Sequence, residues 1–88
     1  MCTYATLRTE LAGSAKVSGG DWHHISSAVV YFDHPVHAMD DHTLNIDLVM
    51  PAAGPSARVA IELTAASART LVDAINAALA SAPDELVG

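Results

Sequence analysis

Apolar and polar residues alternate along the first part of the chain with the period of a β-strand. Between residues 3 and 17 the odd positions are mostly small or apolar, and most even positions carry polar side chains. A period of two is typical of a half-buried strand, and Gly13 predicts a bend within it. Gly19 and Gly20 then predict a chain reversal, because glycine takes positive φ angles without steric cost.

Three further strands are predicted downstream. Residues 22–32 are apolar in both alternating rows, which indicates a strand that is central in its sheet or covered on both faces. Residues 43–49 alternate regularly, and residues 58–63 repeat this pattern over a shorter length. Between them, residues 51–56 contain two prolines and a glycine and are therefore expected to form a turn.

The C-terminal part of the chain has helical periodicity instead. From Ala68 to Ala82 apolar residues recur three or four positions apart, Pro83 ends the pattern, and Thr64 is a suitable N-cap. Residues 84–88 are expected to be frayed. The sequence therefore predicts a single α+β domain over residues 1–88 with the order ββββα, in which a four-stranded antiparallel meander carries one amphipathic helix across its apolar face.

Composition narrows the choice of partners. The chain is 51% hydrophobic, but no run approaches the roughly 18 apolar residues of a membrane span. Ten acidic residues outweigh four scattered basic ones, giving a net charge of −6, whereas nucleic-acid binding requires a concentrated basic surface. We expect neither nucleic acid nor a membrane as a partner. A single cysteine and the lack of signal-peptide features favour a cytoplasmic location.

Size and patterning predict self-association. A chain of 88 residues buries only about 60–65% of the surface that its unfolded state exposes, so its own core is thin. The second predicted strand, which is apolar on both faces, strengthens this expectation. Its residues Val29 and Tyr31 would form an outward apolar patch with Tyr4 and Val49. We expect a homodimer formed through this sheet face.

The densest chemistry lies in residues 31–42, which hold three of the five histidines and three of the seven aspartates. If the hairpin is symmetric about residues 35–41, His34 lies opposite His42, with Cβ atoms about 4.5–5.5 Å apart. Two imidazoles at this distance can share a transition-metal ion such as zinc, iron or copper, and His37 could supply a third nitrogen. Asp33, Asp40 or Asp41 could serve nearby as a base or as an outer-shell partner.

Cys2 is a further candidate ligand. Removal of Met1 would expose an amino-terminal cysteine, whose thiol and amine could bind the metal as a fourth ligand or act as a nucleophile. Strand alternation, however, places Cys2 on the face opposite the apolar row. His23 and His24 are adjacent and face opposite ways on a strand, so at most one of them could join the site.

A purely structural interpretation of these residues stays open. Histidines near a strand end often hydrogen-bond the adjoining loop, and aspartates in a loop often bind their own backbone. Cys2 could equally be a small residue at the end of a strand, without a chemical role. The sequence alone does not decide between these interpretations and a metal site.

Several segments resemble an uncharacterised family of short bacterial proteins. They are the opening Met-Cys-Thr-Tyr, the run Val-Tyr-Phe-Asp-His-Pro-Val-His-Ala at residues 30–38, and residues 41–47 and 59–64. The resemblance covers nearly the whole chain and implies a complete, stand-alone protein. It brings no activity, cofactor or catalytic residue with it.

Standard catalytic motifs are absent. The sequence has no phosphate-binding glycine loop, Gly-x-Ser-x-Gly elbow, paired-cysteine zinc site or His-Glu-x-x-His helix. The leading hypothesis is a small transition-metal-binding protein or metal-dependent enzyme with its histidine site at the 34–42 hairpin. The alternative is a non-catalytic homodimer that binds a small molecule or acts as a scaffold, and whether the protein is an enzyme stays open.

Overall fold

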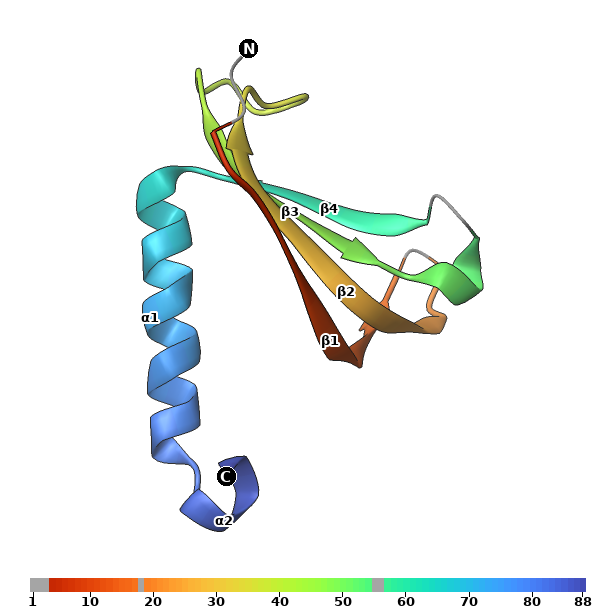
Figure 1. Cartoon of the computed structure of the whole chain (residues 1–88), viewed down its shortest axis with the longest axis vertical. Helices are drawn as coiled ribbons and strands as arrows, with labels where there is room; N and C mark the ends of the chain where they lie inside the picture. Colours follow the sequence, from red (N-terminus) through yellow and green to blue (C-terminus); the bar gives the residue numbers. More distant parts are fainter. Residues whose placement is uncertain (1–3, 18, 55–56) are drawn as a thin grey trace.

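Four antiparallel strands form one sheet in chain order, confirming the predicted ββββα fold (Figure 1). The computed structural model describes residues 4–17, 19–54 and 57–88. The strands are β1 (Thr6–Lys16), β2 (Trp22–Asp33), β3 (Thr43–Val49) and β4 (Arg58–Leu63), followed by the helix α1 (Ala65–Ser81). A 3₁₀ turn, η1 (Pro51–Ala53), and a short helix, α2 (Asp84–Val87), complete the chain.

The predicted bend in β1 is a β-bulge that moves its side chains to the other face. The register with β2 shifts between Glu10 and Gly13, where β1 uses one residue more than its partner. Because strand side chains alternate with a period of two, one extra residue transfers all later residues to the opposite face. The single apolar row predicted from Ala5 to Val17 is therefore wrong and is divided at the bulge.

The sheet has one apolar and one polar face, which we define by register. The apolar face includes Leu7, Thr9, Ala28, Val30, Phe32, Leu44, Ile46, Leu48, Val59, Ile61 and Leu63. The polar face includes Arg8, Ser27, Val29, Tyr31, Thr43, Asn45, Asp47, Val49, Arg58, Ala60 and Glu62. The two central strands, β2 and β3, hold nearly all of the buried residues, which are Ile25, Ser27, Ala28, Thr43, Asn45 and Met50.

The predicted association patch does not form one continuous surface. Val29, Tyr31 and Val49 lie on the polar-face side and are half-buried. Tyr4, in contrast, contacts the rings of Phe32 and His42 at centroid distances of 6.0 Å each. The physical reason is that Tyr4 precedes β1, so strand alternation does not hold its side chain on the polar face.

Helix α1 starts as predicted but does not lie across the sheet. The Thr64 hydroxyl accepts a hydrogen bond from the Ser67 N–H at 3.0 Å, and the helix ends before Pro83. From this start α1 runs away from the strands, so that helix and sheet form the two arms of an open V (Figure 1). Residues 84–87, expected to be frayed, form α2. In the described part of the chain no helix is long and apolar enough to cross a bilayer.

Candidate functional site

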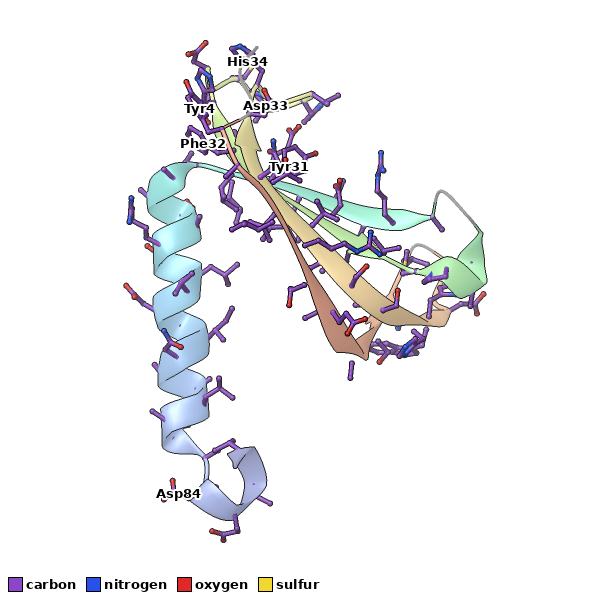
Figure 2. The ribbon with its side chains drawn as sticks, viewed as in Figure 1. Tyr4, Tyr31, Phe32, Asp33, His34 and Asp84 are labelled. Atoms are coloured by element: carbon purple, nitrogen blue, oxygen red, sulfur yellow. The ribbon has the colours of Figure 1, made fainter. Side chains whose placement is uncertain are left out.

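The structure brings His34 and His42 together at one end of the sheet. The predicted register is confirmed, since Phe32 pairs with Leu44 and Val30 pairs with Ile46. His34 and His42 follow directly beyond the last pair of the two strands, with ring centroids 4.4 Å apart at an interplanar angle of 31°. Figure 2 shows His34 at this end of the sheet with Tyr4, Phe32 and Asp33.

Asp41 links the two imidazoles. The Nδ1–H of His42 donates to Oδ2 of Asp41 at 2.8 Å, and the Nδ1–H of His34 donates to the backbone oxygen of Asp41 at 2.8 Å. Nδ1 of His34 also lies 4.0 Å from Oδ1 of Asp41. One potential ligand atom from each of His34, Asp41 and His42 lies within 4.8 Å of the other two. These three residues form the metal-binding candidate, hereafter the His-Asp-His cluster.

The second nitrogen of His42 is buried and unpaired. Its ring stacks on Phe32 at 5.6 Å and 13°, and Nε2 has no hydrogen-bond partner among the described residues. With its proton on Nδ1, directed at Asp41, the neutral ring has a bare lone pair on Nε2. A buried polar atom without a partner costs free energy, so this nitrogen is suited to a ligand that approaches it.

The other predicted ligands are placed differently. The backbone N–H of His37 donates to the carboxylate of Glu62, and its side chain is not part of the His-Asp-His cluster. Cys2 lies outside the described residues. His23 and His24 pair with Ala15 and Ser14 at the far end of β2, so neither can reach the cluster. That end is about ten residues, or roughly 33 Å, from His34.

Glu62 fixes the loop that carries the cluster. Its carboxylate accepts hydrogen bonds from three successive backbone N–H groups, those of Val36, His37 and Ala38, the last at 2.8 Å. These bonds hold the pKa of Glu62 below its usual value of 4.5. The loop is thus tied to β4 as well as to its own hairpin, which positions His34 and Asp41 at its two ends.

A cavity of about 570 Å³ with polar and apolar walls lies between the loop and the polar face. Its walls include Tyr31, Asn45, Asp47 and Arg58. The Tyr31 hydroxyl donates to Oδ2 of Asp47 at 3.5 Å, while Nε of Arg58 lies 4.0 Å from the same oxygen. Burial, followed by the negative charge of Asp47, raises the pKa of Tyr31 above its usual value of 10.0.

Sequence reasoning assigned Asp41 only a supporting role and assigned Glu62 none. The position of Asp41 directly before His42 in the sequence could have indicated its place in the cluster. For Glu62 there was no local signal, because the amides that it binds are 24 to 26 residues away in the chain. Its role follows only from the β3–β4 pairing, which brings the end of β4 beside the loop.

Comparison with known proteins identifies a family but no activity. No curated protein and no solved structure matches the chain. The model of DUF6295, described as a family of unknown function, matches residues 1–88, so the resemblance to an uncharacterised family is confirmed. The chain belongs to the DUF6295 family.

Proposed function

We propose that the protein binds a transition-metal ion at the His-Asp-His cluster. The observation that supports this is the convergence of one ligand atom each from His34, Asp41 and His42 within 4.8 Å. Imidazole and carboxylate donors suit zinc, iron and copper. Three protein donors leave a coordination position for water or a substrate, which is the arrangement of catalytic zinc sites.

The donors need only a small adjustment to bind one ion. Metal–nitrogen and metal–oxygen bonds of about 2.0–2.2 Å place tetrahedral donors about 3.3 Å apart, so separations within 4.8 Å need to shorten by no more than roughly 1.5 Å. His34 allows this movement, because its side chain is 51% exposed. His42 is the fixed member, since it stacks on Phe32 and donates to Asp41.

His42 can bind the ion through Nδ1 or through Nε2, and this choice determines whether Asp41 is a metal ligand or a hydrogen-bond partner of His42. Binding through Nδ1 makes Asp41 a direct ligand and displaces the hydrogen bond between them. Binding through Nε2 satisfies the buried unpaired atom and keeps Asp41 as the acceptor of Nδ1–H, an orientation common around protein-bound zinc. Nitrogen-15 spectra of the histidine rings, with and without zinc, distinguish the two, because the metal-bound nitrogen changes its shift most.

Metal binding is tested on untagged, chelator-treated protein by titration with zinc and with ferrous, cupric and nickel ions. We expect His34→Ala and His42→Ala each to weaken binding at least a hundredfold. His23→Ala is the matched control, because it removes an imidazole from the far end of β2. An equal loss in His23→Ala, or no stoichiometric binding of any of these metals, would contradict the proposal.

Two more variants test the remaining predicted ligands. His37→Ala and Cys2→Ser each remove a donor that the sequence predicted but that is not part of the described cluster. If either weakens binding as strongly as His34→Ala, that residue completes the coordination. If neither does, the site consists of His34 and His42, with Asp41 as the third ligand or as the hydrogen-bond acceptor of His42.

A second candidate function is the binding of a small polar molecule in the cavity beneath the loop. The observation that favours it is the grouping of a hydroxyl, a carboxylate and a guanidinium on its walls, from Tyr31, Asp47 and Arg58. A thermal-shift screen of organic acids and amines on metal-free protein tests it. Stabilisation that is lost in Arg58→Ala but kept in His42→Ala would support this function separately from metal binding.

A further inference from the structure

Helix α1 exposes the side that its sequence marks as apolar. Leu71, Val72, Ile75 and Leu79 are between 42% and 55% exposed. These residues recur at the spacing of one helical face, which in a globular protein is normally buried against a core. One chain therefore leaves the main apolar surface of its helix in water.

The apolar face of the sheet is also incompletely covered. A cleft of about 570 Å³ separates it from the helix, lined by Phe32, Leu44 and Ile46 on one side and by Leu71 and Ile75 on the other. Water in this cleft would lie between apolar walls. Filling the cleft with hydrophobic side chains in place of water would be favourable.

One helix is too narrow to cover this sheet. Four strands about 4.8 Å apart span roughly 19 Å, whereas a helix with its side chains is about 10–12 Å wide. Rotating α1 onto its own sheet would leave about two strands bare. It would also change the backbone at Thr64, the single residue between β4 and α1, whose hydroxyl caps the helix.

The excess of exposed surface matches a dimer interface. A folded protein of 9.1 kDa typically exposes about 4,900 Å², but this chain exposes 6447 Å². Its radius of gyration is 14.7 Å, compared with about 12 Å for a compact chain of this length. Burying the excess of about 1,500 Å² on each of two chains gives roughly 3,000 Å² in total, within the range of obligate homodimers.

From these observations we infer that two copies of the chain interlock through their open clefts, each inserting its α1 helix over the apolar face of the other's sheet. The surface is self-complementary, because each copy provides both an unpartnered helix and an unpartnered sheet, as a two-fold interface requires. Each chain carries a net charge of −6, so association needs an uncharged contact surface. The cleft meets this need, with Arg69 as the charged residue in its lining.

Leu79→Asp tests the interface at an exposed position of α1, because Leu79 is 52% exposed and does not line the cleft. The wild-type protein should have the mass of two 9.1 kDa chains in light scattering. Leu79→Asp should raise the dissociation constant about thirtyfold or more. Ala77→Asp, on the opposite side of α1, adds the same charge and should leave the dimer intact, with circular dichroism confirming the helix in both variants.

Cysteine cross-linking tests whether the α1 helix of one chain lies over the sheet of the other. In a Cys2→Ser background, one chain carries Ile46→Cys in the sheet and a second, differently tagged chain carries Ile75→Cys in the helix. Refolded together and oxidised, they should form a disulfide between the two tagged chains. Three results would overturn the inference: a wild-type monomer at about 100 μM, the absence of a disulfide between the two tagged chains while one chain carrying both Ile46→Cys and Ile75→Cys forms it internally, or a dimer split by Val29→Asp but not by Leu79→Asp.

Discussion

The loop over residues 34–42 and helix α1 leave the same end of the sheet (Figure 1). The loop is held in place by contacts within its own chain, whereas the helix leaves its apolar side exposed. In the loop, Glu62 binds three backbone N–H groups, and Asp41 accepts hydrogen bonds from both histidines. In the helix, the backbone is hydrogen-bonded and capped, while the apolar side chains are exposed. The loop is thus fixed by hydrogen bonds within a single chain, whereas the helix lacks hydrophobic burial.

This difference separates the two proposals. The His-Asp-His cluster needs no second chain, so metal binding should be independent of protein concentration. In the proposed dimer the helix contacts a second chain, so its contribution to stability should depend on concentration. A variant that dissociates the dimer should therefore leave the metal site occupied, and a variant of the histidines should leave the dimer intact.

The largest expected effect is a concentration-dependent melting temperature. For a dimer that unfolds to two chains, each tenfold increase in concentration adds about 1.4 kcal/mol to the free energy of unfolding. For a unit of about 176 residues this raises the melting temperature by about 3–5 °C. Calorimetry at 2, 20 and 200 μM measures it, and a constant melting temperature would show that one chain is thermodynamically complete.

Thr43→Val should have the next largest effect. The Thr43 hydroxyl donates to Oδ1 of Asn45 at 2.7 Å, and both residues are buried. Valine keeps the shape but leaves the Asn45 oxygen without this donor, at a cost of about 1–3 kcal/mol. Thr70→Val removes an exposed hydroxyl from α1 and should change stability by less than about 0.5 kcal/mol in the same urea titration.

A smaller effect is expected from Thr64→Ala at the start of α1. The substitution removes the acceptor for the Ser67 N–H and should lower the free energy of unfolding by about 1 kcal/mol. Thr64→Ser should restore most of the loss, because serine provides the same hydroxyl. Equal stabilities of the alanine and wild-type proteins would show that the cap does not contribute to folding.

The smallest expected effect is local and concerns Glu62. Its pKa is lowered by the backbone N–H groups that it binds, so the ionised form stabilises the folded loop. This contribution is complete above the usual pKa of 4.5 and is lost as the pH falls through the lower, folded-state value. The amide resonances of Val36, His37 and Ala38 should titrate together below pH 4.5. They should not do so in Glu62→Gln, and the Gly54 amide, bonded to a backbone oxygen, should not titrate in either protein.

The sequence was most informative where patterning and turn residues coincided. The bounds of β3 and β4 were predicted residue for residue, since alternating rows there end at proline, glycine or a helix cap. The opposition of His34 and His42 followed from the same hairpin symmetry. Local periodicity is sufficient in these places because each strand pairs with its neighbour in the chain.

Three features required information beyond local pattern. The bulge at Glu10–Gly13 changes the face of β1, yet it leaves the apparent alternation of the sequence intact. The hydrogen bonds between Glu62 and the loop join residues that are distant in the sequence and that only the pairing of β3 with β4 brings together. The amphipathic pattern of α1 predicted an apolar side correctly but could not specify which surface, or which chain, that side contacts.

Because a single residue, Thr64, connects β4 to α1, a small change in its backbone angles moves the whole helix. A helix of 17 residues is about 25 Å long, so a 20° rotation of the backbone at Thr64 displaces its far end by roughly 9 Å. A residue added to the first turn of the helix would turn the rest of α1 by about 100° about its own axis and direct Leu71 and Ile75 away from the cleft. The conformation of Thr64 therefore determines where the apolar side of α1 lies relative to the sheet.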